Sequence, residues 1–302
     1  MSLLIETAVE LGLICSLSVL ALFLSYSMLN ICDLSTDGCF TLGATVGAVV
    51  AISGHPYLSI LAAIIAGCLS GFITAFLQTK MGIDSLLSGI IVNTAMFSIN
   101  IAIMGNSSLL NMNKTVTIFT LLKDTLSETF LSGKQTLIIA FIAVIIVLIV
   151  LNVFLKTRLG IAIRATGNNP VMVKSSSINP EIMITIGLCM SGAFCALSGC
   201  LLAQSQKSVN IDIGQGILTI SLASLLIGNI LSSSSSIRIR SICAVIGTII
   251  FRLVYTFALR LNMPAYMLKL VSSVIVIIAI AGPYLKKNYP LYKRKMEGRK
   301  AC

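Results

Sequence analysis

The sequence predicts an all-α polytopic membrane protein, and three features carry this prediction. Hydrophobic residues make up 57% of the chain, against only 21 basic and 10 acidic residues among 302. Soluble domains carry about a quarter charged residues. Apolar runs near the roughly 20 residues that cross a bilayer recur along the chain between short polar breaks. The same composition excludes intrinsic disorder, because disordered chains lack this apolar content.

Charge and cysteine usage exclude further classes. The net charge is +11, but the basic residues occupy short loops and a C-terminal tail, which argues against a nucleic-acid partner. The nine cysteines form no C-x-x-C pair, and the chain contains a single histidine. We therefore expect no metal site and no disulfide framework.

Nine apolar spans divide the chain, and they predict a single transmembrane domain over residues 1–302. Two of the spans are short and rich in Gly, Ser and Thr: 38–54 and 213–231. The full set is 7–29, 38–54, 57–79, 83–105, 135–157, 181–205, 213–231, 238–259 and 267–285.

The loop charges predict the orientation, because cytoplasmic loops of membrane proteins are enriched in Lys and Arg. With the basic tail 286–302 in the cytoplasm, most of the loop Lys and Arg residues fall on the same side. The N-terminus is then outside, the loop 156–180 is cytoplasmic and the polar loop 106–134 is outside.

The order of the spans predicts two inverted four-helix repeats around a central fifth span. In each half the second span is the short, Gly-rich one, and it follows an acidic residue, Asp33 or Asp212. Paired short segments in inverted halves indicate a transport path. The alternative is that any evenly spaced nine-span chain looks symmetric.

The loop 156–180 is too polar to cross a membrane and too apolar for a plain solvated loop. It predicts short helices that break at 167–170, with Pro170 in the first turn of the second one. We expect Ile163 and Val171 to lie on a surface that docks a partner. The outer loop 106–134 contacts a second partner or is simply solvated.

Several polar residues at membrane depth are candidates for lining a path. Asp33 and Asp37 line it or cap a helix. Asn93 and Asn100 are seven residues apart on one helical face, where they contact cargo or hydrogen-bond to neighbouring helices. Arg252 either snorkels to the interface or is the counter-ion of a carboxylate.

Enzymatic motifs are absent from the sequence. It contains no G-x-x-x-x-G-K-[ST], G-x-S-x-G or H-E-x-x-H, so we expect no catalysis and no nucleotide site of this type. A transporter without its own energy source uses an ion gradient or a separate motor. The partly apolar cytoplasmic loop favours a motor, and an ion-coupled secondary transporter with inverted repeats is the alternative.

Residues 156–170 (KTRLGIAIRATGNNP), continued by SINP at 177–180, resemble the coupling loop of ABC-importer permeases of the branched-chain amino acid and ribose type. Four other segments are similar to that family, and together the matches cover about residues 25–285: 29–44, 78–91, 196–206 and 250–261. More narrowly, these segments resemble the branch that serves aromatic amino acids such as tryptophan or tyrosine.

The resemblance implies a fold of the vitamin B12-importer (type II) kind and a permease for a small amino-acid-like solute in the cell membrane. It also implies a second permease copy, an ABC ATPase subunit that binds the ATP, and an extracytoplasmic solute-binding protein, with no cofactor in this chain. The implied coupling residues are Arg164, Gly167, Asn168, Asn169, Pro170 and Val171, and the expected path residues are Asn30, Asp33, Asn93 and Asn100. The family often has acidic residues where this chain has Asn168 and Asn169.

Overall fold

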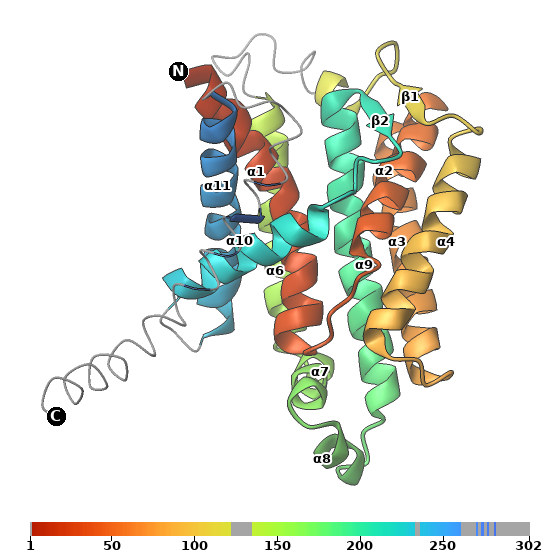
Figure 1. Cartoon of the computed structure of the whole chain (residues 1–302), viewed down its shortest axis with the longest axis vertical. Helices are drawn as coiled ribbons and strands as arrows, with labels where there is room; N and C mark the ends of the chain where they lie inside the picture. Colours follow the sequence, from red (N-terminus) through yellow and green to blue (C-terminus); the bar gives the residue numbers. More distant parts are fainter. Residues whose placement is uncertain are drawn as a thin grey trace, which may run out of the picture.

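The computed structural model describes residues 2–121, 135–232 and 236–260, together with isolated positions between 270 and 281. Helices dominate these residues (Figure 1). The elements are α1 (Ser2–Leu22), the π-helical η1 (Phe23–Met28), α2 (Thr36–Ile52), α3 (Pro56–Thr79), α4 (Ser85–Ile103), β1 (Leu109–Asn111), α6 (Gln135–Phe154), α7 (Arg158–Asn168), α8 (Pro170–Ser175), α9 (Pro180–Gln206), β2 (Ser208–Asn210), α10 (Ile217–Leu231) and α11 (Ile237–Arg260).

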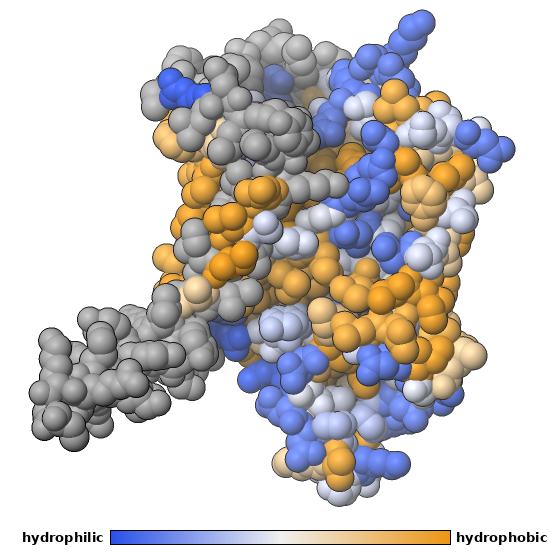
Figure 2. All heavy atoms as spheres, viewed as in Figure 1, coloured by the Kyte–Doolittle hydropathy of each residue, from blue (hydrophilic) through white to orange (hydrophobic). Residues whose placement is uncertain are grey.

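Six helical segments in the described residues are long and apolar enough to cross a membrane, and α2 and α10 are shorter apolar helices. These eight correspond to the first eight predicted spans, including the two short ones. The ninth, 267–285, lies outside the described residues apart from isolated positions, so the inverted repeat stays a prediction. Figure 2 shows hydrophobic residues over the middle of the molecule and hydrophilic ones toward its two ends.

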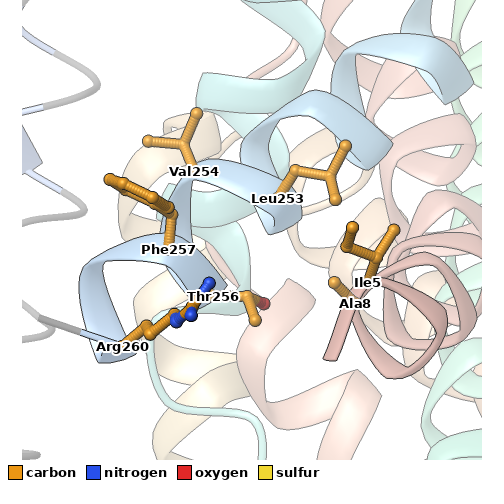
Figure 3. A pocket seen from close by; sticks show the side chains of 7 residues that line it. All are labelled: Ile5, Ala8, Leu253, Val254, Thr256, Phe257 and Arg260. Carbon is orange, nitrogen blue, oxygen red and sulfur yellow. The ribbon is translucent and has the colours of Figure 1, made fainter. Parts of the chain in front are cut away.

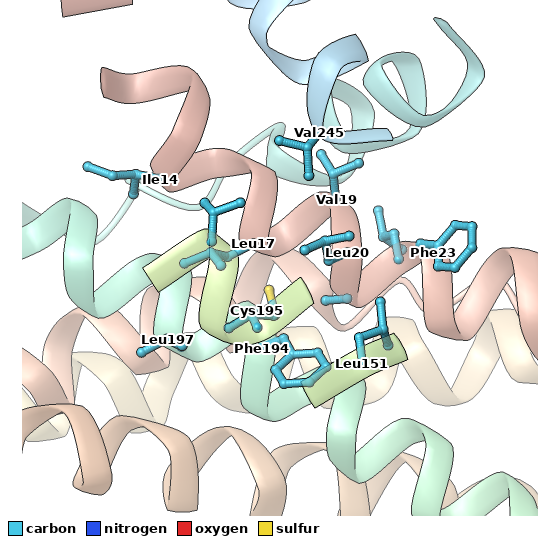
Figure 4. Packing of buried hydrophobic residues seen from close by; sticks show 14 of the residues in the cluster. Ile14, Leu17, Val19, Leu20, Phe23, Leu151, Phe194, Cys195, Leu197 and Val245 are labelled. Carbon is cyan, nitrogen blue, oxygen red and sulfur yellow. The ribbon is translucent and has the colours of Figure 1, made fainter. Parts of the chain in front are cut away.

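The core of the bundle is built on α1 and α9, which are buried along most of their lengths. Leu17 of α1 and Phe23 of η1 pack with Leu151 of α6 and Phe194 of α9 (Figure 4). By contrast, α4 and α6 expose most of their residues. In a bilayer, such exposed apolar faces meet lipid or another chain.

Glycines allow α2, α3 and α9 to approach closely. A Cβ on Gly43 would overlap the backbone of Ala196, and one on Gly67 would overlap the carbonyl of Gly192. Small residues at such contacts let helix backbones touch in a membrane. The G-x-x-x-G spacing beginning at Gly43 is therefore a packing motif of this fold.

The two ends of the bundle differ (Figure 1). At one end, which we call the hairpin end, β1 pairs with β2 in an antiparallel register that places Leu110 opposite Val209. The N-terminus lies at this end, and α7 and α8 lie at the other, which we call the α7–α8 end. Between η1 and α2, the connector 29–35 runs back from the α7–α8 end into the bundle, so that α2 begins inside it.

Candidate functional site

At the α7–α8 end, the two short helices predicted for the loop 156–180 are present. The Thr157 hydroxyl caps α7 by accepting a hydrogen bond from the Gly160 N–H. Asn169 separates the helices and caps α8, because its side-chain oxygen accepts hydrogen bonds from the N–H groups of Val171 and Met172, each at 3.1 Å. Pro170 occupies the first turn of α8, where its missing N–H costs nothing.

The inner face of α7 packs against the connector 29–35. Ile163 is completely buried and packs with Leu29 and Met183. Gly167 lies directly on the start of the connector, since a Cβ at this position would overlap the Met28 carbonyl oxygen and the Leu29 backbone. The expectation that Ile163 belongs to a docking surface is therefore wrong: its side chain holds α7 to the rest of the chain.

The outer face of this end is apolar and basic. Val171 is 77% exposed and Met172 is 64% exposed. Lys174 is exposed on the same helix, Arg158 and Asn168 are exposed at the two ends of α7, and Arg164 is half-buried. Exposed apolar side chains at the polar end of a membrane protein have no lipid tails to contact, so they indicate a site where another protein binds.

A polar cavity of about 210 Å³ lies between α2, α4 and the segment that follows β2. Figure 2 shows hydrophilic residues continuing from the hairpin end toward the middle of this face of the molecule. The walls of the cavity carry amides, hydroxyls, one carboxylate and one aromatic ring. The residues are Asp37, Gly38 and Thr41 of α2, Asn93, Thr94, Phe97 and Asn100 of α4, and Ile211 and Gln215 of the segment after β2.

The structure brings together two of the four predicted path residues, Asn93 and Asn100. Asn100 is buried, and its amide donates to the Gly38 carbonyl at 3.3 Å and accepts from the Thr45 hydroxyl at 3.4 Å. It therefore both lines the cavity and links α4 to α2. Asn93 is half-buried, and its amide makes no hydrogen bond to any described residue, which leaves it available to a solute.

The other two predicted path residues lie elsewhere. Asn30 is exposed, with φ at 59°, in the connector beside α7. Asp33 is buried and accepts hydrogen bonds from the backbone N–H and the hydroxyl of Ser35, at 2.9 and 2.6 Å. Burial raises the pKa of this carboxyl, and the bonds from Ser35 oppose that shift. Neither residue lines the cavity.

Asp37 is a helix cap, but not of its own helix. Its carboxylate accepts hydrogen bonds from the backbone N–H groups of Gly216 and Leu218, at the start of α10. The sequence analysis left Asp37 open between a cap and a path residue, and it is both a cap and part of the cavity wall. Thr41 and Gln215 were not predicted; the only signal was their place in and beside the two short Gly-rich spans.

Arg252 has no carboxylate counter-ion among the described residues, which was one of the two alternatives from the sequence. Its guanidinium donates to the Cys15 sulfur at 2.8 Å and lies 5.9 Å from the centre of the Tyr255 ring. No carboxylate pairs with it in the described part of the chain, where Lys80 and Glu181 form the one ion pair.

A second cavity, of about 370 Å³, lies between α1 and α11 near the hairpin end (Figure 3). Ile5, Leu253, Val254 and Phe257 give it apolar walls, and Arg260 lies at its edge. It offers few groups that would recognise a polar solute, so the cavity beside α4 is the better candidate site. No cluster of metal-ligating side chains occurs among the described residues.

Comparisons with known proteins identify the class of protein. A family model described as the permease component of a branched-chain amino acid transport system matches residues 4–280. The chain belongs to this permease family. It is thus a multi-pass membrane protein and a transport component, in agreement with the resemblance found in the coupling-loop residues.

Three relatives show how far the likeness extends. A tyrosine transport system permease protein of Clostridioides difficile is 33% identical over 89% of this chain and 88% of its own length. An uncharacterized protein of Rickettsia prowazekii is 30% identical over 91% and 96%. A nucleoside ABC transporter permease protein of Lactococcus lactis is 26% identical over 66% and 67%. No solved structure matches the chain.

Proposed function

We propose that this permease is the membrane-spanning subunit of an ATP-driven ABC uptake system for a small amino-acid-like solute. One observation supports the proposal most directly. The stretch of chain from Met28 to the start of α2 contacts α7 at one end and forms part of the cavity wall at the other. Gly167 of α7 lies on the backbone of Met28 and Leu29, and the connector that follows leads into α2, whose first turn forms a wall of the cavity.

The α7–α8 end supports the binding of an ATPase subunit. Val171 and Met172 present an apolar contact, Lys174 adds a positive charge on the same helix, and Arg158 is exposed at the start of α7. Asn169 and Pro170 fix the bend between the helices, and the half-buried Arg164 lies on α7. On this proposal, 156–180 is the cytoplasmic coupling loop, Asn168 is at its exposed tip, and the hairpin end faces outward toward a solute-binding protein.

The cavity supports a neutral or zwitterionic solute. The Asn93 amide has no hydrogen-bond partner among the described residues, and the exposed Phe97 ring lies in the same wall. The Gln215 amide donates to Asp212, the Thr94 hydroxyl donates to the carbonyls of Ile90 and Ile91, and the Asp37 carboxylate is bonded to α10. Amides bind both an ammonium and a carboxylate, and they hold no fixed charge that would slow release. An aromatic amino acid is the solute we propose, because one relative carries the name of a tyrosine permease.

The cavity also supports assembly with a second copy. The half-buried Asn93 of α4, whose amide has no partner among the described residues, lies in the cavity wall beside the exposed Thr94 and Phe97. Polar groups that face lipid without partners cost several kcal/mol, on the order of a lost hydrogen bond in hydrocarbon. A second permease copy against α4 would shield them from lipid and close the path.

Transport in proteoliposomes tests the proposal. We expect liposomes that contain this chain, its ATPase subunit and its solute-binding protein to take up labelled tyrosine only when ATP is present on the α7–α8 side. Uptake should continue when ionophores collapse the ion gradients. Uptake that follows an imposed ion gradient without ATP would overturn the proposal in favour of an ion-coupled secondary transporter.

A further inference from the structure

The segment 211–216, between β2 and α10, covers part of the polar cavity. Ile211 and Gln215 contribute to its walls. Gly214 is pressed onto the first turns of α2, because a Cβ there would overlap both the Asp37 carbonyl oxygen and the Thr41 hydroxyl. The segment is thus in close contact with α2 at its glycine, while Asp212 and Gln215 are exposed and hydrogen-bonded to each other.

Side-chain bonds from a distant part of the chain hold the end of this segment. The Asp37 carboxylate accepts the Leu218 N–H at 2.7 Å and the Gly216 N–H at 3.1 Å. The first N–H groups of a helix have no partners within it, and a negative charge beside them is favourable. Gly216, at the N-cap of α10, has no side chain with which to cap it. The cap comes instead from α2, 179 residues earlier in the chain.

The other end of the segment is tied to the hairpin. The Ile211 N–H donates to the Ser108 carbonyl at 3.0 Å, next to the pairing of β1 with β2. Only turns separate β2 from α10, and their hydrogen bonds lie within the segment, such as the one from the Gln215 N–H to the Asp212 carbonyl at 3.0 Å. These local bonds keep the shape of the segment but do not hold it to α2. A displacement of the hairpin therefore reaches the segment directly, and the contact with α2 resists it.

We infer that residues 211–216 are a lid over the polar cavity and that Asp37 is the positioning residue that latches this lid shut. When the two bonds to Asp37 break and Gly214 leaves α2, the cavity opens toward the hairpin end. The role in solute entry rests on the proposed function, but the latch is a property of the chain that can be measured without transport.

Thiol labelling tests the latch directly. Asn93→Cys places a thiol in the cavity, and a membrane-impermeant maleimide reports its accessibility in membranes that contain the full chain. The chain without this change gives the baseline for the native cysteines. Asp37→Asn removes one of the two charge-assisted bonds and should raise the labelling rate about tenfold. Gly214→Ala, which leaves the carboxylate intact, should raise it as well, because its methyl group meets backbone.

Asp84→Asn is the matched control. The Asp84 carboxylate also caps a helix, since it accepts the Leu86 N–H, but the helix is its own, α4, and Asn caps equally well. Its labelling should equal that of the parent. An unchanged rate in both Asp37→Asn and Gly214→Ala would overturn the inference.

Hydrogen exchange of the unmodified chain provides a test that does not depend on how well a variant folds. The latch predicts that the amides of 211–218 exchange much sooner than those of 219–231 in α10, because they open together without unfolding the helix. Equal protection of the two stretches would overturn the inference. The outcome of this exchange experiment does not depend on whether the chain transports the proposed solute. A failure of the lid inference can therefore be distinguished from a failure of the proposed function.

Discussion

Replacing both Val171 and Met172 with Asp is expected to release the ATPase subunit while leaving the permease folded. The two side chains are 77% and 64% exposed, so their substitution disturbs no core packing. In a complex they would be buried, and burying unpaired carboxylates at the centre of an interface costs several kcal/mol, on the order of a hot-spot contact. Co-purification with the double variant should therefore recover at least about tenfold less ATPase than co-purification with the parent chain.

The control is Leu109→Asp, which places one such carboxylate at an apolar position that is 57% exposed, but at the hairpin end. This variant should retain the ATPase in full. If the double variant at 171 and 172 also retained a stable complex that hydrolyses ATP, the α7–α8 end would not be the docking site. Ile163 is unsuitable for this test, because its complete burial means that Ile163→Asp would unfold the contact with Leu29.

Gly43→Val should destabilise the helix bundle severely. The added side chain would meet the backbone of Ala196, where no flexible side chain can move aside. Overpacking of this kind costs about 3 kcal/mol or more, which corresponds to a fall of about 10 °C in the unfolding temperature. The measurement is the fraction of monodisperse protein that survives heating in detergent, determined by size-exclusion chromatography.

Ile65→Val is the control for this experiment, because the Ile65 side chain is 61% exposed on α3. It should unfold at the temperature of the parent chain. A Gly43→Val protein as stable as the parent would contradict the close α2–α9 contact on which the position of the cavity depends.

Local signals in the sequence predicted much of this architecture. Apolar runs predicted eight of the described helices, and Asn169 followed by Pro170 predicted the break between α7 and α8. The length of an apolar run and the position of a helix-breaking residue determine the structure only of the residues nearby in the sequence. For this reason they can be read without knowledge of the tertiary structure.

Partners that are distant in the sequence could not be predicted. Asp37 bonds to residues 179 and 181 positions away, and nothing local identifies α10 as the helix that it caps. Ile163 looks like any apolar residue of an amphipathic loop until the connector is packed against it. Asp33 was expected in the path because acids at membrane depth need partners, but its partner is Ser35, two residues later in the chain.

Uptake by an Asn93→Leu variant tests most directly whether the polar cavity is the solute path. Leucine has a similar size but cannot hydrogen-bond, so the solute loses an amide partner inside the cavity. The matched control is Ile91→Leu, on the exposed apolar face of the same helix. With ATPase binding unchanged, the initial rate of labelled solute uptake should fall about tenfold in Asn93→Leu and stay at the parent rate in Ile91→Leu. Equal uptake by both variants would contradict a path through this cavity.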